Sequence, residues 1–187
     1  MQRPLNQGHI WLKEIIKSDD LVIDATMGNG NDTCFLARLG ARVTAFDVQE
    51  AAVIKTQQRL IDANLSANLI LDGHQNIQKY VQEPIQAAIF NLGYLPSSDK
   101  SVVTLAETTI SALKQCLNLL AINGRIAIMI YYGHPGGQNE KNAVLEFVSQ
   151  LAQENYQVYQ YSALNQIHQP PFLIMIEKKR ATTKLDN

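Results

Sequence analysis

The sequence predicts an α/β fold in which helices cover both faces of a mostly parallel sheet. Short β-branched runs alternate with segments of helical periodicity from residue 21 to about residue 155. The run at 85–92 is almost wholly apolar, as expected for a parallel strand that is buried on both faces. The last two strand-like runs, 156–163 and 172–178, leave no room for a helix between them and are expected to pair antiparallel.

Each element follows from its own pattern. The expected strands before the C-terminal hairpin are 21–26, 41–47, 68–72, 85–92 and 125–132. The expected helices are 10–16, 32–39, 49–63, 77–81, 102–120 and 140–155. Gly40 is well placed to end the helix before it, and the helix at 10–16 is expected to pack on the sheet or cover the site. Residues 1–187 are expected to form a single domain with a seven-stranded sheet.

Composition excludes several classes of protein. Of the 187 residues 46% are hydrophobic and 18% charged, which allows a full core and disfavours disorder. The net charge of −1 disfavours nucleic-acid binding by bulk charge alone. Cys34 and Cys116 stand far apart without a CxxC, so neither a disulfide scaffold nor a zinc ribbon is expected, and no metal site is predicted. The N-terminus lacks an apolar signal region, so a cytoplasmic protein is expected.

A polar, glycine-containing segment at 24–32 joins the first strand to the next helix. The residues expected to hold a ligand there are Thr26, Gly28, Asn29, Gly30, Asn31 and Asp32. Glycines let the backbone approach a ligand, and the helix N-terminus presents free N–H groups. The third glycine of the dinucleotide fingerprint is absent, and the acidic and amide groups suit a ligand with a cationic end better than a pyrophosphate. A tight turn without a ligand is the alternative interpretation.

Acidic residues also end the second and third strands. Asp47 comes about 20 residues after the glycine loop, where a carboxylate accepts hydrogen bonds from ribose hydroxyls, and Gln49 could reach the same nucleoside. Asp72 could accept from the exocyclic amine of an adenine, and His74 could stack on it or hydrogen-bond to it. The alternatives are helix capping for Asp47 and a surface or capping role for His74.

In an open α/β sheet, ligands bind at the carboxyl ends of the strands, where all these acidic residues fall. In this order and spacing the chain resembles the class I S-adenosylmethionine-dependent methyltransferases, which have a Rossmann-like fold. The resemblance implies S-adenosyl-L-methionine as cofactor, with the glycine loop on its methionine part, Asp47 on the ribose and Asp72 at the adenine. The resemblance includes the terminal β-hairpin, which other doubly wound folds generally lack.

The end of the fourth strand indicates the kind of atom that is methylated. Asn91-Leu92-Gly93-Tyr94 resembles the Asn-Pro-Pro-Tyr motif of methyltransferases that modify amino nitrogens, although Leu92 and Gly93 replace the two prolines. The resemblance implies catalytic roles for Asn91, which would accept hydrogens from the amine, and Tyr94, which would stack on the target base. A strand end followed by an ordinary turn is the alternative.

A loop rich in aromatic residues and glycine follows the fifth strand. Its residues expected to bind substrate are Tyr131, Tyr132, Pro135 and Gly136. His134 could take the proton that the amine releases, although a lone loop histidine is more often structural or exposed to solvent. The segment 165–171, between the last two strands, could shape the site or be an ordinary connection.

The motifs at 24–32, 91–96 and 131–137 together resemble one bacterial family, long labelled rRNA methylases and now associated with the tRNA wobble position. The resemblance implies N-methylation of 5-aminomethyl-2-thiouridine to 5-methylaminomethyl-2-thiouridine, with the anticodon stem-loop of tRNA as partner. The scattered basic residues, among them Lys13, Lys141 and the cluster 178–180, are the candidates for phosphate contacts. A homodimer could combine two modest basic faces.

Three alternatives stay open. A methyltransferase with this fold could act on rRNA or on a small-molecule amine instead. An NAD-dependent oxidoreductase is disfavoured by the missing third glycine and by the terminal hairpin. A non-catalytic nucleoside- or RNA-binding module is disfavoured by the pairing of Asn91 with Tyr94.

Overall fold

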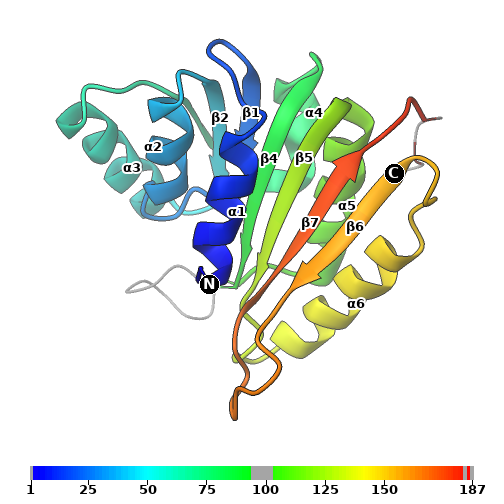
Figure 1. The fold of residues 1–187 in the computed structure, drawn as a ribbon. Helices are drawn as coiled ribbons and strands as arrows, with labels where there is room; N and C mark the ends of the chain where they lie inside the picture. The colour runs from blue at the N-terminus through cyan, green and yellow to red at the C-terminus, as the bar shows by residue number, and fades with distance from the viewer. Residues whose placement is uncertain (1, 94–102, 183–184, 186–187) are drawn as a thin grey trace.

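The computed structural model describes residues 2–93, 103–182 and 185. They form a seven-stranded sheet in the order β3-β2-β1-β4-β5-β7-β6 (Figure 1). The strands are β1 (Leu21–Asp24), β2 (Arg42–Asp47), β3 (Asn68–Leu71), β4 (Ile85–Leu92), β5 (Leu120–Ile130), β6 (Tyr156–Tyr161) and β7 (Phe172–Lys178). The first five strands pair in parallel, and β7 is antiparallel to both β5 and β6. The predicted α/β fold and its C-terminal hairpin are therefore confirmed.

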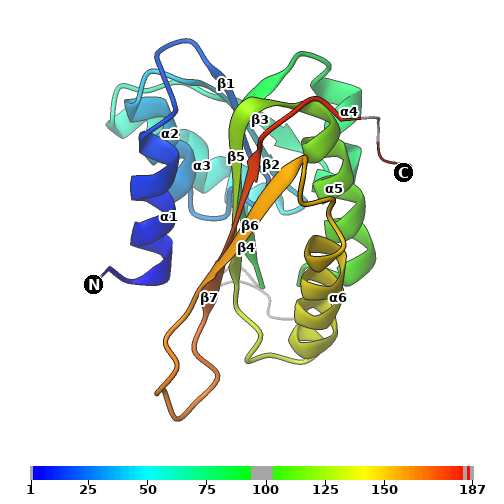
Figure 2. The same cartoon turned by 45° about the vertical axis from the view of Figure 1, so that its right-hand side comes forward.

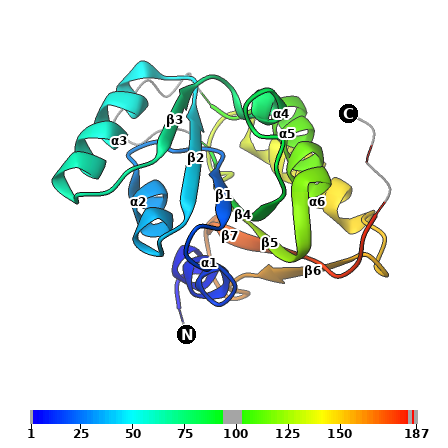
Figure 3. The same ribbon diagram turned by 90° about the horizontal axis from the view of Figure 1, so that it is seen from above.

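Helices cover both faces of this sheet. They are α1 (Pro4–Lys13), α2 (Asn31–Arg38), α3 (Glu50–Asp62), α4 (Ile77–Tyr80), α5 (Ala106–Leu119) and α6 (Gly137–Ser149), with a 3-10 turn η1 (His74–Asn76) before α4. The first three helices lie on one face of the sheet and the last three on the other (Figures 2 and 3). Each face has its own apolar core. Within the described part of the chain, no helix is long and apolar enough to cross a membrane.

The N-terminal helix begins earlier than the expected 10–16. Pro4 stands at the first helical turn, where its missing N–H costs no hydrogen bond. The helix packs on β5 and β7 at Gly8, where a Cβ would lie 3.3 Å from Leu173 Cδ1, so glycine permits the close approach. Arg125 of β5 secures the helix by donating to the Trp11 carbonyl at 2.6 Å and to Glu14 at 2.8 Å.

Two further boundaries differ from the expected ones. The strand expected at 125–132 runs from Leu120 to Ile130, so both tyrosines after it lie in the loop. The helix expected at 140–155 begins at Gly137, because Gly136 adopts a left-handed conformation with φ of 83° and turns the chain into the helix.

The directions of the strands place the loops that follow β1 to β5 at one edge of the sheet. The carboxyl ends of β1 to β5 share the lower edge of the sheet in Figure 1. Because β6 runs in the same direction as β5, the β6–β7 connection returns to that edge. The N-terminus of α1 lies there too (Figure 1).

Candidate active site

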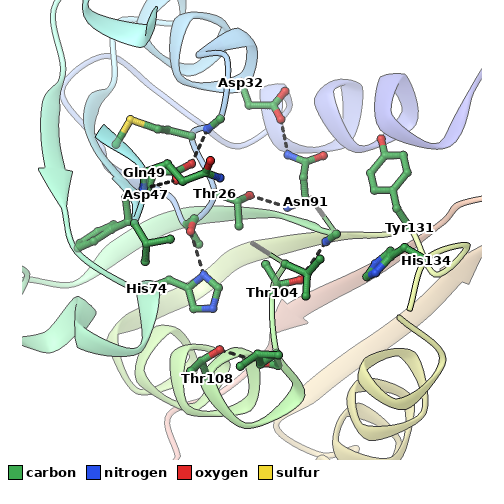
Figure 4. Close-up of a pocket in the computed structure, with 18 of the residues that line it drawn as sticks. Thr26, Asp32, Asp47, Gln49, His74, Asn91, Thr104, Thr108, Tyr131 and His134 are labelled. Carbon is green, nitrogen blue, oxygen red and sulfur yellow. Dashed lines mark hydrogen bonds between the residues drawn. The ribbon is translucent and has the colours of Figure 1, made fainter. Parts of the chain in front are cut away.

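A cavity of about 650 Å³ opens at the carboxyl edge of the sheet. Loops after all five parallel strands line it, with Leu5 of α1 and Gln169 and Pro171 of the β6–β7 connection. The predicted site residues that it brings together are Thr26, Gly28, Asn29, Asn31, Asp32, Asp47, Gln49, His74, Asn91, Tyr131, Tyr132 and His134 (Figure 4). Tyr94 lies outside the described residues.

Four predicted residues do not line the cavity. They are Gly30, Asp72, Pro135 and Gly136. Gly136 is the N-cap of α6, and the Pro135 carbonyl is 3.0 Å from His134 Nδ1. Gly30 shapes the loop instead: its φ is +77°, and a Cβ there would lie 2.8 Å from Thr56 Oγ1. Only glycine fits both the conformation and the space.

Asp47 ties the glycine loop to the end of β2. Its Oδ2 accepts from the Gly28 amide at 3.0 Å, and its Oδ1 accepts from the Gln49 amide at 2.9 Å. Burial raises the pKa of Asp47, and the backbone hydrogen bonds oppose that rise. A carboxylate has about four lone-pair sites, so Asp47 keeps acceptor capacity for a hydroxyl group of a ligand in the cavity.

Asp72 does not line the cavity in which it was expected to meet the adenine. Its carboxylate accepts from Asn76 Nδ2 at 2.8 Å and from Tyr80 Oη at 2.9 Å. These hydrogen bonds, that of Asn76 foremost, lower the pKa of Asp72. Asp72 thus orders the turn into α4, and the next two residues, Gly73 and His74, line the cavity in its place.

His74 presents a buried acceptor to the cavity. Its Nδ1 lies 3.1 Å from the Ala25 carbonyl, and burial lowers its pKa, so the ring is neutral and Nδ1 carries the donated hydrogen. The other nitrogen, Nε2, is buried and has no hydrogen-bond partner among the described residues. A buried acceptor that lacks a partner is costly, which suggests that a ligand N–H completes it.

At the end of β4, hydrogen bonds to neighbouring side chains fix Asn91. Asn91 Nδ2 donates to Asp32 Oδ2 at 2.5 Å, and the backbone N–H of Asn91 donates to Thr26 Oγ1 at 2.7 Å. Figure 4 shows the Asn91 side-chain oxygen on the side of Tyr131. Asp24 lies fully buried behind this group and accepts from Thr33 Oγ1 at 2.7 Å. Burial and the neighbouring Asp32 raise the pKa of Asp24 to about 7.

A second network fixes the backbone after β4. Thr104 Oγ1 accepts from the Gly93 amide at 2.9 Å and donates to Glu140 Oε2 at 2.7 Å. Thr109 Oγ1 donates to the other oxygen of this buried glutamate, also at 2.7 Å. The sequence reasoning missed Glu140 and both threonines, because their contacts join α5 and α6 to a strand end far away in the sequence.

Tyrosines close the β5 side of the cavity. Burial, with a smaller contribution from Asp32, raises the pKa of Tyr131. The ring of Tyr132 packs edge-on against Phe172, and Lys141 Nζ lies 4.4 Å from its centroid. Tyr132 therefore belongs partly to the core, whereas Tyr131 is 38% exposed at the mouth of the site.

The cavity suits a nucleoside with a polar amino-acid end. It combines the Asp47 carboxylate at the end of β2, the turn at Gly28 and His74 Nε2, which has no partner in the described part of the chain. The sequence matches the model of the family described as "Putative rRNA methylase" over residues 43–177, most of the chain. The chain belongs to this family. It is an S-adenosylmethionine-dependent RNA methyltransferase with a Rossmann-like fold.

Similar proteins agree with this assignment to the RNA methyltransferases. A "putative rRNA-methylase" from Clostridium thermocellum is 46% identical and superposes with a TM-score of 0.93 over 95% of this chain and 98% of that one. A "putative methyltransferase" from Streptococcus mutans, solved in complex with SAH, is 54% identical, with a TM-score of 0.90 over 95% and 99% of the two chains. A chloroplastic tRNA (mnm(5)s(2)U34)-methyltransferase of Arabidopsis thaliana is 34% identical over 91% of this chain and 68% of that protein.

Proposed function

We propose that this RNA methyltransferase methylates the side-chain amine of 5-aminomethyl-2-thiouridine at the wobble position of tRNA, giving the 5-methylaminomethyl nucleoside. The observation that carries the proposal is Asn91, which lines the cavity at the end of β4 and has its amide nitrogen engaged by Asp32. Its oxygen remains to accept a hydrogen from an amine. The plant relative, named for the same nucleoside position, supports this choice of acceptor.

The β1–β3 side of the cavity would hold the cofactor. Asp47 would accept the ribose hydroxyls, His74 Nε2 would accept from the adenine amine, and the loop at 28–31 would hold the methionine end. Bound S-adenosylmethionine supplies a methyl group that is already activated on a sulfonium. The chain therefore contributes mainly position, which can account for a large part of the acceleration.

The β4–β5 side would hold the acceptor. Asn91 Oδ1 would accept an N–H of the aminomethyl group and so orient the nitrogen lone pair. Tyr131 lies on the same side and would flank the base, and Tyr94 is proposed to stack on it. His134 lines the cavity and is proposed to receive the released proton, directly or through water. Neither Cys34 nor Cys116 lines the cavity, in keeping with direct transfer to nitrogen.

Contacts to tRNA need a basic surface, and one groove near the site offers it. Arg38, Lys55 and Arg59 line this groove together with Asn29 of the glycine loop, whose carbonyl accepts from Arg59 Nε at 2.8 Å. Lys178, one of the basic residues considered above, is instead buried and donates to the carbonyls of Leu117 in α5 and Leu120 at the start of β5. A wobble base lies in a single-stranded loop, so presenting it to the cavity requires little unstacking. A homodimer remains a prediction.

The decisive assay offers the enzyme and S-adenosylmethionine two tRNA pools, one bearing the aminomethyl group and one lacking it. We expect methyl incorporation only into the first pool, at a rate that rises with pH through the pKa of the amine, because only the neutral amine has a free lone pair. Equal incorporation into both pools would refute the proposal. Incorporation into rRNA or a free amine alone would favour the alternative substrates.

The Asn91→Ala variant tests the role of the amide in this reaction. We expect methyl transfer to fall by about 100-fold or more, because the amine is no longer oriented. The affinity for SAH, measured by calorimetry, should stay within about twofold of the wild-type value. A variant that methylates at the wild-type rate would show that another group orients the acceptor.

A further inference from the structure

The first helix places a histidine against the site, and the proposed function has not used it. His9 Nε2 lies 2.6 Å from Asp32 Oδ1, and the Asn91 side chain donates to the other oxygen of the same carboxylate. The three side chains come from α1, α2 and β4. In the sequence, His9 is 23 residues and Asn91 is 59 residues from Asp32. The Asp32 side chain is only 8% exposed, and that of His9 is 23% exposed.

The carboxylate decides which way the Asn91 amide points. An ionised carboxylate can only accept hydrogen bonds, so the nitrogen of the amide must face Asp32 and the oxygen must face away from it. Figure 4 shows the oxygen on the side of Tyr131. Without Asp32 the amide could turn over, which would present N–H donors where an amine needs an acceptor.

His9 is itself held on two sides. Its ring stacks on Phe35 of α2, with centroids 4.0 Å apart and an angle of 11° between the planes. The helix that carries it is fixed to the sheet by the close contact at Gly8 and by Arg125, whose guanidinium lies 4.7 Å from the centroid of the Trp11 ring. The docking of α1 therefore determines where His9 meets Asp32.

We propose that His9 and Asp32 are positioning residues that fix the Asn91 amide with its oxygen toward the methyl acceptor. The acceptor part of this inference rests on the proposed function. Asp32 was expected to hold the cofactor, and the inference reassigns it: its two oxygens already accept from His9 and Asn91. The N-terminal helix thereby becomes part of amine recognition, because it supplies the first member of the chain His9–Asp32–Asn91.

A double-mutant cycle separates positioning from direct participation. Asp32→Asn should lower kcat on aminomethyl-bearing tRNA by at least about tenfold and leave the SAH affinity within about twofold. In the Asn91→Ala background the same substitution should have almost no further effect, because Asp32 acts only through that amide. Additive losses, or a tenfold weaker affinity for SAH, would overturn the proposal and make Asp32 a base or a cofactor ligand.

Variants of His9 test the first link. His9→Ala should lower kcat by several-fold, and His9→Gln should recover much of the loss, because its side-chain N–H can still donate to Asp32. The exposed Asn6 of α1 provides the control, and Asn6→Ala should match the wild type. Fluorescence of Trp11, the only tryptophan, reports whether α1 stays docked in each variant. Equal losses for the alanine and glutamine variants with α1 docked would overturn the role of His9.

One measurement is independent of the RNA substrate. The side-chain amide resonances of Asn91 in the SAH complex, assigned through Asn91→Ala, should shift in Asp32→Asn and His9→Ala and stay in place in Asn6→Ala. Resonances that do not move would overturn the proposal. If they move but wild-type enzyme fails to methylate the aminomethyl-bearing tRNA, the positioning network stands and the proposed function fails.

Discussion

The two sides of the cavity are held together in different ways. On the β1–β3 side, Asp47 and His74 bond to backbone groups of neighbouring loops, namely Gly28, Gln49 and Ala25. On the β4–β5 side, the carboxylates of α2 and α6 bond to side chains from elements distant in the sequence, as in His9–Asp32–Asn91 and Thr104–Glu140–Thr109. The β1–β3 side is therefore set by loop geometry, whereas the β4–β5 side depends on the docking of α1, α5 and α6.

Asp47 and Asp72 form a matched pair for testing the first side. Asp47→Ala should weaken SAH binding by roughly 1–3 kcal/mol, since ribose hydroxyls would lose their acceptor. Asp72→Ala removes a carboxylate at an equivalent strand end that does not line the cavity, so the affinity should change by less than about twofold. Calorimetry on both variants decides the question, and the opposite ranking would return Asp72 to the adenine.

The second side should be sensitive to a residue that does not line the cavity. Glu140→Ala should cost about 2 kcal/mol of unfolding free energy, because buried Thr109 loses its acceptor and Thr104 loses its anchor. Methyl transfer should fall while SAH affinity stays near wild type, and Glu146→Ala on the exposed face of α6 is the control. Denaturant unfolding and calorimetry test both parts. A variant as stable as the control would show that the network contributes little.

Asp24 links the two sides and should make stability depend on pH. Its native pKa of about 7 exceeds the unfolded value of 3.8, so between these values the native state holds a proton that the unfolded state has lost. The contribution of Asp24 to stability is therefore full below pH 3.8 and is lost as pH rises toward 7, by roughly 1 kcal/mol per pH unit. Denaturant unfolding of Asp24→Asn should lack this slope, whereas Asp62→Asn at the exposed end of α3 should retain it.

On the β1–β3 side, substitution of His74 should change SAH affinity less than substitution of Asp47. His74→Phe should weaken SAH binding by about fivefold, the loss of one hydrogen bond of roughly 1 kcal/mol. In the wild type, protonation of Nε2 would replace the acceptor with a donor. Because burial lowers the pKa of His74, the affinity should be steady down to pH 6.5 and fall only in more acidic buffer. Calorimetry at several pH values should show this loss of SAH affinity in acidic buffer for the wild type and not for the variant.

Residues placed by local motifs could be predicted from the sequence, whereas residues placed by contacts between distant elements could not. The glycine loop and Asp47 were predicted because strand ends and short motifs place them locally, and the fold followed from the alternation of strands and helices. His9, Thr104 and Glu140 were missed because their roles depend on contacts between distant elements. The local partners of Asp72, Asn76 and Tyr80, could not be foreseen, because no motif reveals hydrogen bonds within the turn that follows β3.

The position of β7 inside the sheet has a consequence for biosynthesis. Strand β5 is complete at Ile130, yet its neighbour on that side begins only at Phe172, after β6 has been made. At about 5–20 residues per second, a nascent chain would carry the apolar edge of β5 unpaired for several seconds. Unpaired edges of this kind template aggregation. A chain that stopped before Phe172 would leave β5 exposed as an edge and β6 without a neighbouring strand, and it is expected to be bound by chaperones or degraded rather than to form a smaller enzyme.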